Sequence, residues 1–346
     1  MRRVVIVMIL VFILASQVNA MEIEAPEVPQ SGISFMPETT DSFGQGLIEV
    51  VTDGLQYLVP ALKDACRVCF SMVCIVLVVS LPRAFSGNIQ KVTELIGAVA
   101  LGAILLESSG SMVSLAADTV SQISEYGRLL LPVMTTAMAA QGGITASAAL
   151  YAGTAMFDAL VCALISKLLI PLLYMFLALA VAYSAIGEEM LKKLRDTLKG
   201  FLTWVLKTVL YVFTGYISIT GVISGTTDAA VMKAAKLTIS GAVPVVGGIL
   251  SDATGAVLVG IGTMKNAAGL YGLFAILSIA MGPFLKIGAQ YLVLKLTAAL
   301  CGIFGNKQTN ELIGDVSTAM GFLLGMTGTV SVMLLISTVC FMKGVG

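Results

Sequence analysis

The chain has 346 residues, of which 58% are hydrophobic and only 12% are charged, and 20 Lys and Arg balance 20 Asp and Glu. Soluble domains carry about 25% charged residues, so this composition excludes a water-exposed surface over most of the chain and indicates a membrane protein. The zero net charge argues against nucleic-acid binding, and the absence of His removes the commonest general base and metal ligand.

Residues 1–20 have the form of a secretory signal peptide. Arg2 and Arg3 precede an apolar stretch, and the small residues Val18 and Ala20 follow it where cleavage is expected. The alternative is an uncleaved first helix. In both cases the next segment lies outside the cytoplasm.

Residues 21–62 are expected to form an extracytoplasmic acidic tail followed by an amphipathic helix. No Lys or Arg occurs between Arg3 and Lys63, as the positive-inside rule expects of a translocated segment. Apolar residues recur at helical spacing over 43–62, which predicts a helix lying on the membrane surface.

A transmembrane hairpin is predicted at 63–128. Its first crossing covers about 67–81, and the Lys and Arg of the following loop place that loop in the cytoplasm. The second crossing begins near residue 95 and is interrupted by polar residues from Glu107 onwards. Residues 118–128 are then expected to return to the outside.

The rest of the chain is interpreted as an internal duplication, with halves at 129–224 and 225–346. Identical residues recur at one constant offset, embedded in matching hydropathy. The defining pairs are Pro132 with Pro244, Pro171 with Pro283, and Gly143 with Gly255. Transporter-like membrane folds are often built from such halves.

Each half contains three apolar segments, and the first of them is rich in Gly and Ala. The segments lie at 129–150, 153–186 and 201–224 in the first half and at 241–263, 267–301 and 316–341 in the second. The Gly-rich segment either re-enters the membrane or crosses it, in which case the repeat is inverted. The basic stretch at 188–199 is expected in the cytoplasm. The predicted fold is therefore an all-α polytopic membrane protein with duplicated halves and Gly-rich re-entrant or broken segments.

Ionisable residues inside apolar segments are candidates for a polar cavity, because a charge at membrane depth is costly and usually faces the bundle interior. The candidates are Asp158, Asp252 and Lys286. For Lys286 a position at a membrane interface is an equal alternative, and Lys167, Lys207 and Lys295 are interpreted as snorkelling to an interface. No P-loop, GxSxG or HExxH motif occurs, so neither an enzyme, nor a cofactor, nor a metal site is expected.

Several stretches in the second half resemble the stage III sporulation protein AE family. They are Gly262–Phe274 (GTMKNAAGLYGLF), Pro283–Ile287 (PFLKI), Lys295–Leu300 (KLTAAL) and Glu311–Ser317 (ELIGDVS). The resemblance implies a role in endospore formation, as a membrane subunit of a transenvelope complex that links mother cell and forespore and has been viewed as a channel. It carries over no catalytic residue.

The implied location is the mother-cell membrane around the forespore, and the implied partners are other membrane subunits of the complex and the lipid bilayer. A nucleic-acid partner is not expected. The alternative function is a self-sufficient secondary transporter or permease, which a duplicated architecture would suit.

Overall fold

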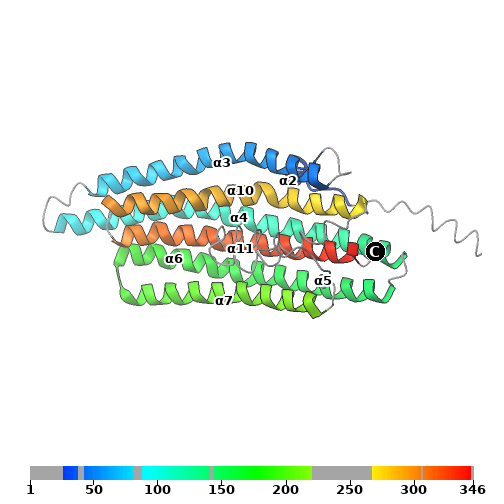
Figure 1. Cartoon of the computed structure of the whole chain (residues 1–346). Coiled ribbons are helices and arrows are strands. Elements are labelled where there is room, and N and C mark those ends of the chain that lie inside the picture. The colour runs from blue at the N-terminus through cyan, green and yellow to red at the C-terminus, as the bar shows by residue number, and fades with distance from the viewer. Residues whose placement is uncertain are drawn as a thin grey trace, which may run out of the picture.

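A computed structural model describes residues 26–37, 43–80, 88–140, 144–219, 267–304 and 307–343. All regular structure in these ranges is helical. The elements are α2 (Gln30–Ile33), α3 (Phe43–Ser80), α4 (Asn88–Ala140), α5 (Ile144–Leu164), the π-helix η2 (Ile165–Leu169), α6 (Ile170–Ile186), α7 (Glu189–Ile219), α10 (Ala267–Phe304) and α11 (Lys307–Lys343). The long helices run side by side along one axis and form an elongated bundle (Figure 1).

The all-α membrane fold predicted from the sequence is confirmed. Within the described ranges, four stretches are long and apolar enough to cross a membrane: Leu95–Ala137, Tyr151–Ile186, Gly269–Ile303 and Lys307–Met342. The crossings expected at 67–81 and 201–224 are not among them. Their described parts, 67–80 and 201–219, belong to the longer helices α3 and α7, which carry polar residues along much of their length.

The helix ends gather at the two ends of the bundle. α3, α6 and α10 end where α4, α7 and α11 begin, whereas α2 lies at the opposite end (Figure 1). At the first of these ends Arg195 of α7 pairs with Asp315 of α11 at 2.7 Å, and Lys192 pairs with Glu311 at 3.7 Å. We call it the charged end.

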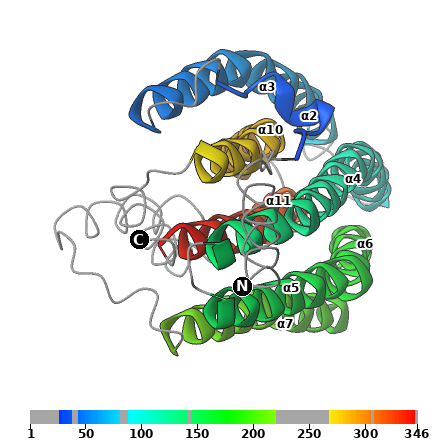
Figure 2. The ribbon, with the colours of Figure 1, turned by 90° about the vertical axis from the view of Figure 1, so that its right-hand side faces the viewer.

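Helix α11 forms the centre of the bundle. Every residue from 319 to 342 is buried, and the helix packs against α4, α5, α6, α7 and α10. Figure 2, viewed from one end, shows these helices around it. Small residues permit the close packing, since a Cβ added to Gly127 of α4 would lie 3.0 Å from Leu334 Cδ1.

Helix α4 contains the second part of the hairpin predicted at 63–128. It runs without interruption through 107–117 and through 118–128, so the polar residues from Glu107 onwards do not break the helix, and the return of 118–128 to the outside stays a prediction. The polar residues there recur at helical spacing instead of clustering in a turn. With 53 residues, α4 is about 80 Å long at 1.5 Å per residue, far more than the ~30 Å hydrocarbon core.

The internal duplication is only partly within the described residues and stays a prediction. Pro132 lies in α4, Pro171 lies in the first turn of α6, and Pro283 lies inside α10. The signal-like residues 1–20, the segment 241–263 and the residues Gly143, Pro244, Asp252 and Gly255 lie outside the described ranges. The segment expected at 129–150 is not a separate element, because α4 continues to Ala140 and α5 begins at Ile144. The α6–α7 and α10–α11 connections lie at the same end of the bundle, whereas an inverted repeat would place them at opposite ends (Figure 1).

Candidate functional site: a polar face on helix α4

Helix α4 carries a continuous polar surface on the outside of the bundle. Between residues 107 and 128 every exposed residue of α4 is polar, and we call this set the polar face: Glu107, Ser111, Ser114, Asp118, Ser121, Glu125 and Arg128. Their spacing alternates between four and three residues, so they line one side of the helix. α4 lies at the edge of the bundle, between α3 and α6 (Figure 2). The face is about 32 Å long, comparable to the hydrocarbon thickness.

Two contacts fix the depth of this face relative to the neighbouring apolar helices. Gly102 packs against α6, where an added Cβ would lie 2.7 Å from Val181 Cγ1. Further along, Ser124 Oγ donates a hydrogen bond of 2.7 Å to Asp158 Oδ2 of α5. The segment of α4 from 102 to 124 therefore runs alongside the apolar span Tyr151–Ile186.

The outward surface of that apolar span is different in chemistry. Its large exposed hydrophobic residues between 156 and 175 are Met156, Leu160, Leu168, Tyr174 and Met175, and Lys167 is the one exposed charged residue there. Such a surface suits lipid, whereas exposed carboxylates and a guanidinium at the same depth do not, because transferring charge into hydrocarbon is costly. The polar face of α4 therefore requires water or polar protein groups beside it.

Contacts within the face are local and leave its carboxylates toward the outside. Ser111 Oγ donates to the backbone oxygen of Ser108 at 2.8 Å, and Ser114 Oγ donates to Asp118 Oδ2 at 3.5 Å. The face holds three carboxylates and one guanidinium, so it is net negative. A net-negative aqueous surface attracts cations and repels anions.

Asp158, a candidate from the sequence, lies directly behind the polar face. Its carboxyl is buried between α4 and α5, accepts the hydrogen bond from Ser124, and lies near enough to Arg128 for the charges to interact. Lys286, the second candidate, is half-buried on α10 and forms no ion pair with any residue of the described ranges. The structure does not join Asp158 to Lys286, and a shared cavity with Asp252 stays a prediction.

A buried ion cluster holds α7 to α11 at the charged end. The Arg195 guanidinium bonds Asp315 at 2.7 Å and Glu311 at 3.3 Å, and it lies 4.9 Å from the ring centre of Tyr183. Burial alone would lower the pKa of Arg195, but the carboxylates of Asp315 and Asp196 raise it above its ordinary value. The guanidinium therefore stays charged and fixes the register of the two helices.

Neither the polar face nor the Arg195 cluster was among the residues predicted from the sequence. The alternating spacing of four and three residues from Glu107 to Arg128 is a signal that could have revealed the face. The partners of Arg195 lie 116 and 120 residues further along the chain, and spacing alone could not have indicated them.

The known proteins that this chain resembles in sequence are sporulation proteins. The family model described as "Stage III sporulation protein AE" matches residues 38–344. A curated relative from Bacillus subtilis (strain 168), called "Stage III sporulation protein AE", is 23% identical over 258 residues. That alignment covers 74% of this chain and 65% of the relative, less than two thirds of its length. No solved structure matches the chain.

Proposed function

Because the chain belongs to the stage III sporulation protein AE family, we propose that it is a membrane subunit of the transenvelope complex linking mother cell and forespore. Within that complex the polar face of α4 lines an aqueous path. One observation supports this most directly: charged residues are exposed on α4 at the depth where the adjacent span α5–α6 is apolar. The complex's other membrane subunits and the lipid bilayer are the partners.

The proposed orientation places the charged end in the cytoplasm of the mother cell. The basic stretch at 188–199 begins α7 at this end, and Lys307 begins α11 there. Positive residues favour the cytoplasmic side. α2 lies at the opposite end (Figure 1), in agreement with an extracytoplasmic tail in the mother-cell membrane around the forespore.

The direction of the polar face also favours a subunit over a self-sufficient transporter. Single-chain transporters place their polar residues near the midplane, between their own helices. Here the face points away from the bundle, so neighbouring subunits are needed to close a path around it. Solute transport by the purified chain alone in liposomes would instead favour the transporter.

Cysteine accessibility tests the aqueous path. In a variant lacking the six native Cys, single Cys replace Ser114 or Ser121 on α4, and Leu168 and Leu160 in the adjacent apolar span serve as controls at matching depth. In sporulating cells the α4 positions should react much faster with a small water-soluble thiol reagent, because thiolates form in water and not in lipid. Similar rates in the two sets would contradict the proposal.

A further inference from the structure

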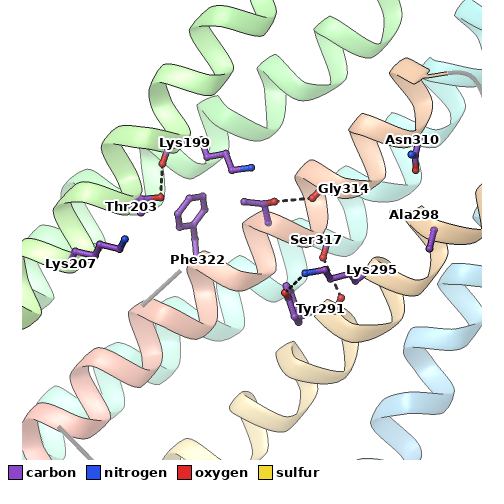
Figure 3. Close-up of a pocket in the computed structure, with 12 residues that line it drawn as sticks. Lys199, Thr203, Lys207, Tyr291, Lys295, Ala298, Asn310, Gly314, Ser317 and Phe322 are labelled. Carbon is purple, nitrogen blue, oxygen red and sulfur yellow. Dashed lines mark hydrogen bonds between the residues drawn. The ribbon is translucent and has the colours of Figure 1, made fainter. Parts of the chain in front are cut away.

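A cleft of about 630 Å³ lies between α7, α10 and α11, separate from the polar face of α4. Lys199 and Lys207 line it from α7, Lys295 lines it from α10, and Asn310 and Ser317 line it from α11 (Figure 3). The three lysines come from two helices, and none of the described residues that line the cleft is a carboxylate. The cleft is therefore strongly positive.

Within the described ranges the lysines of the cleft are not engaged in ion pairs, although Lys199 lies near enough to Asp315 for their charges to interact. Among the described residues, no carboxylate lies within ion-pair distance of Lys199, Lys207 or Lys295. The nearby acidic residues are occupied, since Asp315 and Glu311 pair with Arg195. An anion in the cleft would meet three ammonium groups without displacing an existing ion pair.

The remaining lining adds hydrogen-bonding groups beside the lysines. Lys295 Nζ donates to Tyr291 Oη at 3.1 Å, which holds the ammonium at the cleft wall (Figure 3). The side-chain oxygen of Asn310 is buried and has no hydrogen-bond partner in the described part of the chain. Such an oxygen can accept a hydrogen bond from a ligand hydroxyl. The cleft thus suits a ligand that combines a negative charge with hydroxyl groups.

The position of the cleft fits the headgroup region of a membrane. Asn310 is near the start of α11 at the charged end, and α10 ends nine residues after Lys295. Trp204, the only tryptophan of the chain, is exposed on α7 between the two lysines, with Phe201 also exposed. Tryptophan favours the membrane interface, and basic pockets between helices on the cytoplasmic side bind anionic headgroups.

We propose that this cleft binds the headgroup of an anionic glycerophospholipid, with Lys199, Lys207 and Lys295 around the phosphate and Asn310 accepting from a headgroup hydroxyl. This site does not depend on the aqueous path. The lipid source is favoured over a free phosphate compound because Trp204 and Phe201, at the same level of α7 as the cleft lysines, are exposed as interfacial aromatic residues are.

The test measures lipid binding by the purified full chain in detergent. The probes are phosphatidylglycerol, phosphatidylcholine with the same acyl chains, inorganic phosphate and glycerol 3-phosphate. Phosphatidylglycerol should bind at least tenfold more tightly than each of the others. Equal binding of a soluble phosphate probe would overturn the lipid assignment, and equal binding of phosphatidylcholine would overturn the role of charge.

Variants locate the site. The triple change Lys199→Gln, Lys207→Gln, Lys295→Gln should weaken phosphatidylglycerol binding by on the order of fivefold per lysine. The control removes three exposed lysines elsewhere, Lys63→Gln, Lys167→Gln and Lys193→Gln, and should retain most of the affinity. Equal loss in both triples would overturn the proposal in favour of general surface attraction. The isosteric Asn310→Asp keeps all lysines and should also weaken binding, so unchanged affinity in this variant would likewise contradict the site.

Discussion

Two neighbouring helical surfaces lie at the same depth of the bundle but expose residues of different chemistry. The outward side of α4 from Glu107 to Arg128 is polar, whereas the outward side of α5–α6 from Met156 to Met175 is mainly apolar, with Ser166 and Lys167 as its exposed polar residues. The hydrogen bond from Ser124 to Asp158 aligns the two surfaces. Since one bilayer surrounds both, they cannot have the same neighbour. We expect α5–α6 to face lipid and the polar face of α4 to face water or polar protein groups.

The difference between the two surfaces shows why the chemistry of exposed side chains must be considered together with their depth in the membrane. A polar helix face is unremarkable on a soluble bundle, and an apolar one is unremarkable in a membrane. Only their coexistence at one level of the same bundle points to an incomplete assembly. In the proposed function the chain forms part of the wall of an aqueous path, and other chains form the rest of the wall.

The largest effect is expected from placing a new carboxylate on each surface in turn. Leu160→Glu on α5 should strongly reduce membrane insertion, by about 2.5–3.5 kcal/mol on insertion scales, because the charge would face lipid. Ser121→Glu, at nearly the same depth on α4, should insert almost normally. Quantifying the membrane-integrated protein for both variants checks this prediction. Equal loss in the two would remove the distinction between the surfaces.

A smaller effect is expected from breaking the bond that aligns the surfaces. Ser124→Ala leaves the buried Asp158 carboxyl without its hydrogen-bond donor, and it should lower the free energy of unfolding by about 1–3 kcal/mol. Ser111→Ala, on the exposed polar face, is the control and should stay within about 0.5 kcal/mol. Denaturant unfolding in detergent measures both. If Ser124→Ala were as stable as its control, the alignment of α4 with α5 would be in doubt.

The smallest change in the free energy of unfolding is expected at Asp118, where a substitution should nevertheless lower spore yield. Asp118→Asn changes only the charge of an exposed side chain, so the free energy of unfolding should change by less than about 0.5 kcal/mol. It removes one of three carboxylates from the proposed path and should lower spore yield in a spore-forming host. Asp64→Asn on the exposed side of α3 is the matched control. Normal spore counts from both variants at normal protein levels would argue against the path.

The membrane class and the helical fold could be predicted from composition and apolar run length. The positions of loops and spans could not be predicted, because polar residues on one face of a helix and polar residues in a connecting loop look alike in sequence. The polar residues from Glu107 onwards are predicted to interrupt a crossing, yet they lie within one continuous helix, because the exposed ones follow one face of α4. The basic stretch at 188–199 was also read as a connection, yet α7 begins at Glu189. The turn is confined to the residues around Gly187, whose φ of 76° suits glycine and whose N–H bonds Tyr183 O at 2.8 Å.

The candidate site was harder to predict than the fold. Asp158 could be singled out as a candidate, because a carboxyl in an apolar run needs a partner, and its role in a polar cavity stays a prediction. Its partner Ser124 is 34 residues away, in a segment predicted to return to the outside, so spacing alone could not indicate it. Hydropathy also cannot separate an apolar helix that faces lipid from one that faces protein. α5–α6 and α11 are both apolar, yet the first is widely exposed and the second is buried from 319 to 342.

The central position of α11 has a consequence for biogenesis. Among the described helices, α11 is the last to leave the ribosome, yet it fills the axis around which the earlier helices pack. Helices enter a membrane individually before they associate. The earlier helices must therefore remain loosely associated in the bilayer, with the α11-facing sides of α4, α6 and α10 open, until α11 has been made. The bundle can close only after every helix from α3 to α11 has been inserted.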